Sequence, residues 1–582
     1  MVLLAFWTVL LVPGYGRAAT LLVEAEAFSQ LGGWQVDQLA MDVMGSPYVL
    51  AHGLGVPVAD ATTKIVIRDP GRYRVFVRTK DWVARWKAPG TPGRFQLLID
   101  GRALAATFGT QGSDWFWHDG GIVRLDAGEA TLALHDLTGF EGRCDAVLLS
   151  SDADFVPPNE PAALAAFRRK LLGLPAQPDE AGRYDLVVAG GGMAGCCTAV
   201  AAARLGLKVA LLQDRPVLGG NSSSEIRVWI NGRFQLKPYP LIGEIVSELY
   251  TRPKASPGEA REFGDERKLQ VLRAEPNVRL FLWQHVNGVE MEGRRMRAVL
   301  AAHVLSGRQS RFTGRWFADC TGDASVGRLA GADSEMAASD HQGSSNLWKV
   351  EDCGKPVSFP RCPWALDLRD KPFPSRLGDL GIWFWESGFD RDTIGEAEAI
   401  RDHNLRAMYG AWDCLKNVKR LYPNHRLAWA AYISGKRESA RLLGDVILST
   451  DDILAARPFP DACVPATWSI DLHGPHPQYA AAAPDNPFIS EAKFTHLKAP
   501  YPIPFRCLYS RNIANLMMAG RDISVTHEAL GTVRVMATGG MMGEVLGRAA
   551  FLCKKYDTDP RDVYGLHLDE FQRLLTKSTL RK

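Results

Sequence analysis

The sequence predicts an α/β protein with a Rossmann-like parallel sheet, an inserted α+β domain and an all-β sandwich in front of it. Three observations lead to this fold class. A glycine cluster, GGGMAG, joins an apolar run of strand length to an alanine-rich run of helix length. Residues 20–150 hold short alternating segments that begin at turns. A proline- and alanine-rich stretch at 151–183 separates these two blocks.

The composition is that of a globular protein with a large core. Of the 582 residues, 46% are hydrophobic and 23% are charged, and the net charge is +3. This length accommodates about three or four domains, and the balanced charge argues against a nucleic-acid-binding surface. The predicted divisions are a sandwich at 19–150, a linker at 151–183, a first nucleotide-binding part at 184–334, an inserted substrate or cap domain at 335–500, a second nucleotide-binding part at 501–556 and a C-terminal helix or tail at 557–582.

Residues 1–18 have the features of a signal peptide. Val2 to Val12 form an apolar run, interrupted only by Thr8, that is too short to span a membrane, and Gly16-Arg17-Ala18 supplies a small-x-small cleavage pattern. A buried strand is the alternative interpretation. We therefore expect an exported bacterial protein, periplasmic or extracellular, with no membrane span in the mature chain.

The segment from 19 to 150 is expected to fold as a sandwich of jelly-roll type. GRYRVFVRTKDWV and GRFQLLIDGRAL alternate apolar and polar residues, and GGIVRLDAGEATLALHDL carries two strands around the turn at 126–128. The opening LLVEAEAFSQLGGWQVD resembles that of carbohydrate-binding-module-like sandwiches. Six aromatic side chains either form a sugar-stacking platform or fill the core. They are Trp34, Trp82, Trp86, Trp115, Phe116 and Trp117.

The glycine cluster lies in a strand–turn–helix–strand unit, YDLVVAGGGMAGCCTAVAAARLGLKVALLQD. Gly190 permits a tight turn, Gly192 lets the backbone approach a pyrophosphate, and Gly195 lets the helix pack close to the strand. The N-terminus of the helix supplies free N–H groups for phosphate. The end of the second strand normally carries a carboxylate for the ribose hydroxyls. Gln213 occupies that place here, and Asp214 follows it.

The segments that follow resemble those of FAD-dependent oxidoreductases. In RPVLGGNSSSEIRVWING, an Arg and a Gly-Gly turn match the stretch that lies along the pyrophosphate and ribitol of FAD. GRWFADCTGDASVGRLAGAD, from 314 to 333, resembles the A-T-G-D segment near the adenosine half. NLMMAGRDISVTHEALGTVRVMATGGMMGEVLGRAA, from 515 to 550, resembles the C-terminal flavin motif, whose helix N-terminus faces the flavin pyrimidine ring.

Residues 184 to 556 resemble a bacterial FAD-dependent oxidoreductase family that also carries the segments GKRESARLLGDVILSTDDI and WSIDLHGP. The resemblance implies a glutathione-reductase-like nucleotide fold with FAD as the cofactor. It implies cofactor contacts from Gly190, Gly192, Met193, Ala194, Gly195, Gln213, Asp214, Arg215, Gly219, Gly220, Asn221, Ser222, Val286, Thr321, Gly322, Asp323, Gly520, Arg521, Asp522, Gly539 and Gly540.

A more distant resemblance to the flavin subunit of heterodisulfide reductases raises the question of an iron–sulfur cluster. The ten cysteines include no C-x-x-C pair, which argues against such a cluster, and no metal site is predicted. Cys353 and Cys362 are spaced to pair across a loop if the protein is exported. A free buried thiol is the expected state of most of the others.

Three residues are the candidates for catalysis. His527 follows the predicted flavin-binding strand, and His473 precedes Gly-Pro at what we expect to be an exposed strand end. Either histidine is suited to accept a hydroxyl proton while hydride leaves the carbon, and the alternative for each is a loop histidine bonded to backbone. Arg534 lies close to the flavin motif and is suited to bind a carboxylate, a hydroxyl or the cofactor phosphate.

The RESAR segment begins what we expect to be a helix-like apolar run. Its Arg437, Glu438 and Arg441, together with Asp471, are further polar candidates. For Glu438 and Arg441 the favoured interpretation is structural, with the two side chains paired and holding two domains together.

The expected function is that of an FAD-dependent oxidoreductase that oxidises an alcohol or a similar C–H group by hydride transfer to flavin N5, with a carbohydrate as one substrate class. The alternatives are a flavin-dependent reductase of C=C or C=O bonds and a glycan-binding protein with an inactive flavin domain. The expected partners are a small-molecule or glycan substrate and an electron acceptor of unknown identity.

Overall fold

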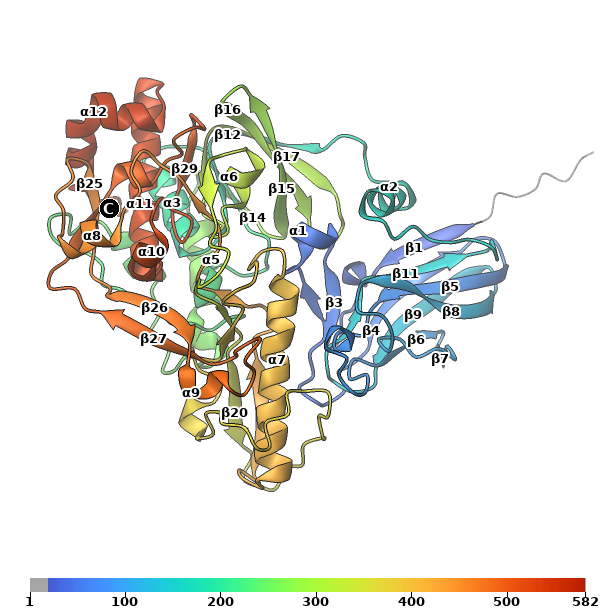
Figure 1. The fold of residues 1–582 in the computed structure, drawn as a ribbon. Helices are drawn as coiled ribbons and strands as arrows, with labels where there is room; N and C mark the ends of the chain where they lie inside the picture. The colour runs from blue at the N-terminus through green and yellow to red at the C-terminus, as the bar shows by residue number, and fades with distance from the viewer. Residues whose placement is uncertain (1–18, 581–582) are drawn as a thin grey trace, which may run out of the picture.

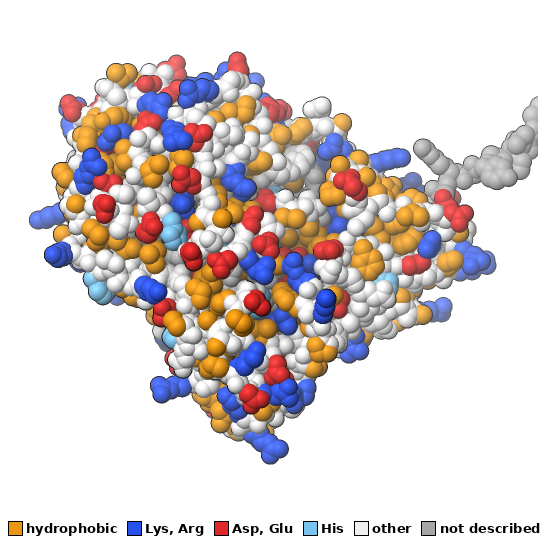
Figure 2. Space-filling view, viewed as in Figure 1, with side chains coloured by type: hydrophobic (Ala, Val, Ile, Leu, Met, Phe, Trp, Pro, Cys, Tyr) orange, Lys and Arg blue, Asp and Glu red, His pale blue; other side chains and the backbone are white. Residues whose placement is uncertain are grey.

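The computed structural model describes residues 19–580, so the predicted signal peptide lies outside the described residues. An N-terminal β domain packs beside a larger α/β part, and the long helix α7 (Ala397–Asp413) stands between them (Figure 1). In the part of the chain that is described, no helix combines the length and the apolar character needed to cross a bilayer. On the face shown in Figure 2, basic and acidic side chains alternate instead of gathering by sign.

The N-terminal β domain contains two four-stranded antiparallel sheets that share one core. Val75 and Val147 from one sheet and Leu97 and Leu132 from the other are fully buried in that core. One sheet has the order β1-β11-β5-β8, formed by β1 (Thr20–Glu24), β11 (Ala146–Ser150), β5 (Gly71–Thr79) and β8 (Phe116–Leu125). The other has the order β4-β9-β6-β7, formed by β4 (Ala61–Ile67), β9 (Gly128–Asp136), β6 (Phe95–Ile99) and β7 (Arg102–Ala103).

The two strands predicted around the turn at 126–128 are β8 and β9, but they do not pair with each other. β8 pairs with β5, and β9 pairs with β4 and β6. The turn therefore carries the chain from one sheet to the other. A third small sheet, in the order β10-β3-β2, is formed by β10 (Gly142–Cys144), β3 (Tyr48–Ala51) and β2 (Gln35–Asp37). The short helix α1 (Met41–Met44), between β2 and β3, lies toward the larger part of the molecule (Figure 1).

Two of the six aromatic side chains of this domain fill hydrophobic cores, as the core-filling alternative states, and cannot belong to a sugar-stacking platform. Trp34 is 2% exposed and packs edge-on against Phe95. Trp82 is 2% exposed and packs against Trp364 of the inserted region. The other four are half-buried, and they are Trp86, Trp115, Phe116 and Trp117.

The predicted strand–turn–helix–strand unit is confirmed and forms the centre of a mostly parallel sheet. Its strand order is β14-β13-β12-β17-β16-β15, and β29 pairs with the end of β17. β12 begins at Asp179, inside the predicted linker, whose other element is the helix α2 (Pro161–Leu171). The strands are β12 (Asp179–Ala189), β13 (Val209–Leu212), β14 (Val278–Phe281), β15 (Gln284–Glu292), β16 (Arg295–His303), β17 (Gln309–Asp319) and β29 (Leu516–Met518).

Two helices with small residues, α3 (Met193–Arg204) and α11 (Met536–Tyr556), pack closely against each other beside this sheet. A Cβ on Gly543 would lie 2.1 Å from the carbonyl oxygen of Ala194, and a Cβ on Gly547 would lie 2.5 Å from the Cβ of Ala201. Glycine at these positions therefore permits the close approach. This contact brings the C-terminal motif next to the first glycine turn.

The inserted region combines α7 with short helices and hairpins, as the α+β prediction requires. Its helices are α8 (Thr450–Leu454) and α9 (Pro477–Ala480), and a π-helical turn (Cys414–Val418) extends α7. Its strands are β18 (Ser334–Glu335), β19 (Ser344–Ser345), β20 (Trp348–Asp352), β21 (Glu386–Ser387), β22 (His425–Ala430), β23 (Gly435–Lys436), β24 (Arg441–Leu442), β25 (Ala462–Ala466), β26 (Ile470–Pro475), β27 (Ser490–Thr495) and β28 (Tyr501–Pro504). The remaining helices of the α/β part are α4 (Glu244–Leu249), α5 (Asp265–Arg273), α6 (Ser325–Leu329), α10 (His527–Val533) and α12 (Pro560–Leu575).

Three local expectations for this region are wrong. The RESAR segment is not helical, because β23 and β24 pair with distant strands β19 and β18. His473 is not exposed: it lies within β26 with 7% of its surface accessible. Cys353 and Cys362 do not form a disulfide and are free thiols, like the other eight cysteines.

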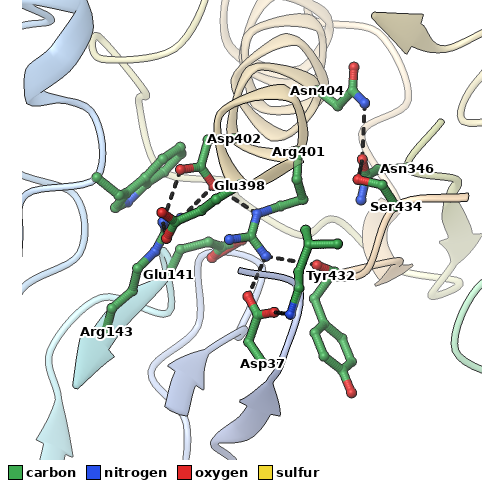
Figure 3. A network of polar contacts seen from close by, with 12 residues as sticks. Asp37, Glu141, Arg143, Asn346, Glu398, Arg401, Asp402, Asn404, Tyr432 and Ser434 are labelled. Atoms are coloured by element: carbon green, nitrogen blue, oxygen red, sulfur yellow. Dashed lines mark hydrogen bonds and ion pairs between the residues drawn. The ribbon is translucent and has the colours of Figure 1, made fainter. Parts of the chain in front are cut away.

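A buried ionic network fixes the N-terminal β domain on α7 (Figure 3). Arg143 of β10 contacts Glu398 at 2.7 Å and Asp402 at 2.6 Å. Arg401 contacts Asp37 of β2 at 2.7 Å and also contacts Asp402. Ionised groups are costly to bury unless they are paired and hydrogen-bonded, so this arrangement holds only while both regions are in place.

Candidate active site

One cavity lies where strands β12, β13 and β17 end and where helices α3 and α11 begin. The carboxyl ends of parallel strands are the usual ligand site in open α/β sheets. The cavity brings together most of the residues predicted to bind the cofactor. Its walls include Gly190, Gly192, Met193, Ala194, Gln213, Asp214, Arg215, Gly219, Gly220, Asn221, Val286, Thr321, Gly322, Asp323, Gly520, Arg521 and Gly539.

Four residues of the predicted cofactor set lie behind the cavity wall. Gly195 supports the turn, because a Cβ there would lie 1.8 Å from the carbonyl oxygen of Gly190. Gly540 lets α11 approach α4, because its Cβ would lie 2.5 Å from a methyl group of Val246. The hydroxyl of Ser222 donates to the carbonyl of Gly219 at 2.9 Å. The fourth residue is Asp522.

Asp522 is fully buried beside Asp319. Burial and the charge of Asp319 raise its pKa well above the usual range. One of its oxygens accepts a hydrogen bond from the N–H of Gly322 at 3.2 Å, which joins the C-terminal motif to the T-G-D turn. Asp522 is therefore a buried link between two of the predicted cofactor-binding segments, and its other oxygen, Oδ1, has no hydrogen-bond partner among the described residues.

The glycine turn leaves room for a ligand. Gly190 has a φ of +97°, and a Cβ there would lie 2.3 Å from the carbonyl oxygen of Cys320. A Cβ on Gly192 would meet no atom within 4 Å, because this residue faces the cavity. Gly192 is also the N-cap of α3 and supplies no side chain to its first N–H groups. Those groups are free to bind a phosphate.

A second helix N-terminus opens on the same cavity. The N-cap of α11 is Val535, whose side chain cannot accept a hydrogen bond from the first turn, and Met536 and Gly539 line the cavity. The positive ends of two helices therefore lie along one cavity. This arrangement fits a dinucleotide with one anionic pyrophosphate and one ring system that gains negative charge on reduction.

Four cationic side chains add to this positive field, and they are Arg215, Lys436, Arg521 and Arg534. Lys436 and Arg521 contact Asp323 at 2.5 and 3.3 Å. Burial alone would raise the pKa of Asp323, but these two cations outweigh it and hold the pKa at about 2. Nη1 of Arg521 is buried without a hydrogen-bond partner in the described structure, as expected of a group that awaits an anionic ligand.

Gln213 does not replace the missing ribose carboxylate. Its carbonyl oxygen accepts from the N–H of Gly191 at 2.7 Å, and its amide nitrogen donates to the carbonyl of Val217 at 3.0 Å. Both ends of this side chain are thus used to hold the glycine turn. Asp214, which lines the cavity with a side chain that is 42% exposed, is the carboxylate available at this strand end.

These features fit FAD, with α3 and Gly192 at the pyrophosphate, Asp214 and Val286 at the adenosine half, and the start of α11 at the flavin. The three candidate catalytic residues are placed differently. Arg534 lines the cavity close to the start of α11, whereas His473 and His527 do not line it. Each histidine instead belongs to a cluster that lies near Arg534.

The first cluster connects Arg534 to His473. Nη2 of Arg534 lies 3.2 Å from Asp471, and Asp471 lies 3.2 Å from Nε2 of His473. Burial lowers the pKa of Arg534 to about 10, which keeps the guanidinium charged at neutral pH. Its Nε is buried without a hydrogen-bond partner among the described residues. The side chain therefore brings a free donor and a positive charge to the cavity wall.

His473 has a carboxylate on each side of its ring. Nδ1 lies 2.7 Å from Glu386, and Nε2 faces Asp471. Burial would raise the pKa of both acids, but Arg437 and His473 around Glu386, and His473 and Arg534 around Asp471, hold each pKa at about 2. Both ring nitrogens thus face carboxylates of the protein, and His473 does not line the cavity.

The second cluster contains His527, the first residue of α10. Its Nδ1 lies 2.8 Å from Glu438, and the hydrogen bond to Glu438 raises the pKa of His527 against the effect of burial. Glu438 also contacts Arg441 at 2.7 Å, which confirms the structural pairing expected for the RESAR segment. His527 is 26% exposed, and its Nε2 has no hydrogen-bond partner among the described residues.

Several cavity residues could not be found from the motifs. Lys436 immediately precedes the RESAR residues, and Gln284 and His285 immediately precede Val286. Their proximity to a predicted site residue is the one local signal they give. Gln38, Leu39 and Asp42 come from the N-terminal β domain, where no sequence feature indicated a contact with a nucleotide.

The comparison with known proteins supports a flavoprotein. A family model described as FAD dependent oxidoreductase matches residues 185–353 and 374–575, more than half of the chain. A search of curated protein sequences found no match.

Solved structures give low similarity scores. The chondrochloren halogenase CndH of a myxobacterium, a variant of FAD-dependent halogenases, has 15% identity and a TM-score of 0.31, over 68% of this chain and 79% of that chain. A geranylgeranyl bacteriochlorophyll reductase-like protein from Thermoplasma acidophilum has 13% identity and a TM-score of 0.31, over 68% and 89%. A family 35 carbohydrate binding module from Clostridium thermocellum has 16% identity and a TM-score of 0.18, over 22% and 97%.

Proposed function

Because the chain belongs to the FAD-dependent oxidoreductase family, we propose that it oxidises an alcohol or a similar C–H group by two-electron hydride transfer. When bound, FAD supplies the hydride-accepting centre for this chemistry. The observation that carries the proposal is Arg534, a charged side chain with an unpartnered Nε on the cavity wall beside the start of α11.

Arg534 is suited to hold the oxygen of the substrate. A guanidinium donates hydrogen bonds in a fixed plane and keeps its charge, so it orients a hydroxyl or carboxylate and stabilises negative charge on oxygen. Asp471 anchors the guanidinium, and His473 with Glu386 anchors Asp471 in turn. In this proposal His473 is a positioning residue, because it does not line the cavity and reaches Arg534 only through Asp471.

His527 is the proposed proton acceptor. Its Nε2 is free of partners in the described structure while Glu438 holds Nδ1, the arrangement of an imidazole oriented by a carboxylate. It lies outside the cavity wall, so the proton reaches it through the polar groups around Arg534 or through a water. A substrate with several hydroxyl groups, such as a carbohydrate, presents the required C–H and O–H together.

The experiment is an anaerobic screen of the purified yellow protein against alcohols, sugars and amines, with loss of flavin absorbance as the readout. An oxidised substrate bleaches the flavin, and R534M slows bleaching by about 100-fold or more, the usual effect of removing one oxyanion donor. R534K recovers part of the rate, and FAD content stays unchanged. The control is R297M, which removes an exposed arginine of strand β16 in the mostly parallel sheet.

The reverse reaction, reduction of a C=O or C=C bond, is the second candidate, because Arg534 is equally placed to polarise a carbonyl oxygen. The same protein, reduced chemically and mixed with carbonyl compounds and enones, tests it. If these compounds restore the flavin absorbance and no alcohol, sugar or amine bleaches it, the proposal of substrate oxidation is wrong and the reductase assignment replaces it.

A further inference from the structure

A segment of the N-terminal β domain forms part of the cofactor cavity. Gln38 and Leu39, which follow β2, and Asp42 of α1 all line it, together with residues of the parallel sheet. The family match begins only at residue 185. The contribution of residues 38–42 is therefore a property of this two-part chain and not of the matched region.

The segment is held in place from both sides. Oδ1 of Asp42 lies 3.1 Å from Nε2 of His285 at the start of β15. Val304, which follows β16, is 1% exposed and belongs to the hydrophobic core of the β domain. Asp37, one residue before Gln38, is bound to Arg401 of α7. Residues 38–42 thus form a fixed wall of the cavity.

The neighbours of this wall identify the end of the cavity on which it lies. The N–H of Gln284 donates to the carbonyl of Gln213 at 2.9 Å, so the start of β15 lies against the end of β13. In a strand–helix–strand dinucleotide unit, the pyrophosphate lies at the helix N-terminus and the ribose lies at the end of the second strand. The end of β13 is that position, so residues 38–42 face the adenosine half.

Gln38 has a side chain prepared for a ligand. It is 6% exposed, and both its amide nitrogen and its amide oxygen are buried without a hydrogen-bond partner in the described structure. The side-chain oxygen of Gln284, which also lines the cavity, is likewise buried and unpartnered in the described structure. A buried amide without partners is costly. A ligand that supplies one acceptor and one donor side by side removes that cost.

Adenine supplies this pair of groups. Its exocyclic amine donates and its adjacent ring nitrogen accepts, and a glutamine amide matches both at once. We propose that Gln38 hydrogen-bonds the adenine of FAD and that the N-terminal β domain is thereby part of the cofactor site. The inference rests on FAD as the cofactor and is independent of the substrate that is oxidised.

The test compares Q38L with Q35L in the full-length holoenzyme. Gln35 is an exposed residue of β2 in the same domain and serves as the matched control. Dissociation of FAD is followed by the rise of flavin fluorescence after dilution. We expect Q38L to release FAD about tenfold faster than the wild type, the factor that corresponds to one or two lost hydrogen bonds. Q35L is expected to match the wild type. Equal release from Q38L and Q35L would overturn the proposal.

ADP locates the contact within the dinucleotide. It carries the adenine without the flavin, and its binding to the FAD-free protein is measured directly by calorimetric titration. We expect the dissociation constant of ADP to be about tenfold higher for Q38L than for Q35L, because the lost contact is on the adenine. If Q38L weakens FAD binding but leaves the dissociation constant of ADP unchanged, Gln38 does not touch the adenine and the proposal is wrong.

A folding defect is recognised by a separate measurement. The Gln38 amide bonds to no group of the described protein, so Q38L and Q38M are expected to unfold, without added FAD, at or above the temperature of the wild type, because each removes a buried amide that has no partner. The increase in unfolding temperature that saturating FAD produces is expected to be smaller in both variants. If both variants unfold at a lower temperature without FAD and gain the full increase with it, Gln38 has only a structural role and the proposal is overturned.

Discussion

His285 of the parallel sheet and Asp42 of the N-terminal β domain form an ion pair, with 3.1 Å between Nε2 and Oδ1. This contact lies beside the cofactor cavity and crosses between the two parts of the chain. Burial would lower the pKa of His285, but the hydrogen bond and charge of Asp42 raise it. Burial would raise the pKa of Asp42, but His285 lowers it.

The ion pair predicts a pH window for its contribution to stability. A raised histidine pKa contributes stability below about pH 6.5 and loses it as the pH rises through the folded-state pKa. A lowered aspartate pKa contributes above about pH 4 and loses it as the pH falls through its own folded-state value. The pair is therefore strongest between about pH 4 and 6.5.

We expect H285Q to lower the unfolding temperature most near pH 5 to 6 and least near pH 9. Because the Asp42 side chain is 41% exposed, solvent screening limits the effect to less than about 1 kcal/mol. H303Q is the control. Because burial lowers the pKa of His303, protonation of this residue does not stabilise the fold, and H303Q is not expected to lower the unfolding temperature near pH 5 to 6. An H285Q deficit that grows with rising pH would contradict the assignment.

The glycine turn predicts opposite consequences for two neighbouring substitutions. G195A places a methyl group 1.8 Å from the carbonyl oxygen of Gly190, so we expect it to destabilise the folded protein by about 1–3 kcal/mol. G192A places a methyl group in the open cavity, so we expect normal stability without FAD and weaker FAD binding. Thermal unfolding without FAD and FAD titration separate the two effects. Similar behaviour of both variants would contradict these roles.

The interdomain network predicts a large effect for a single substitution. R143M removes the cation that contacts Glu398 and Asp402 and leaves two buried carboxylates short of a partner. The expected loss of unfolding free energy is about 3–5 kcal/mol. K64M, which breaks an exposed pair with Glu129 in the same domain, is expected to cost about 0–1 kcal/mol. Urea unfolding measures both losses of unfolding free energy. Equal losses would show that the buried network stabilises the protein no more than an exposed ion pair does.

The His527–Glu438 pair predicts a shift in the pH dependence of flavin reduction. Glu438 raises the pKa of His527, so the wild-type rate of flavin reduction should rise with pH, with a midpoint above about pH 6.5. E438Q removes the charge and is expected to shift this rising limb of the pH–rate profile to lower pH by about one unit. H527Q is expected to abolish the limb, whereas H496Q leaves it unchanged. A limb that stays in place in E438Q would exclude His527 as the proton acceptor.

The sequence predicted the parts of the fold that depend on neighbouring residues. The unit around Gly190, Gly192 and Gly195 was predicted because strand, turn and helix follow one another directly. The prediction that this unit lies next to Gly520 and Arg521 came from the family resemblance, because no local sequence pattern indicates which distant segments meet. The structure brings these segments to one cavity through the close packing of α3 on α11.

The errors share one physical cause, which is contact with distant residues. The RESAR segment has a helix-like composition, yet strand pairing with β18 and β19 determines its conformation. His473 precedes Gly-Pro but is buried against Glu386 and Trp383, which come from a distant segment. Gln38 gave no signal at all, because its importance depends on how the β domain packs against the sheet.

Helix α7 carries Glu398, Arg401 and Asp402 on the surface that it presents to the β domain, and each of these charges has its counterpart there. A shortened chain that begins at β12 would expose this charged surface to solvent and remove one side of the nucleotide pocket. We therefore expect the two parts to unfold together in a single transition, whether or not the flavin is bound.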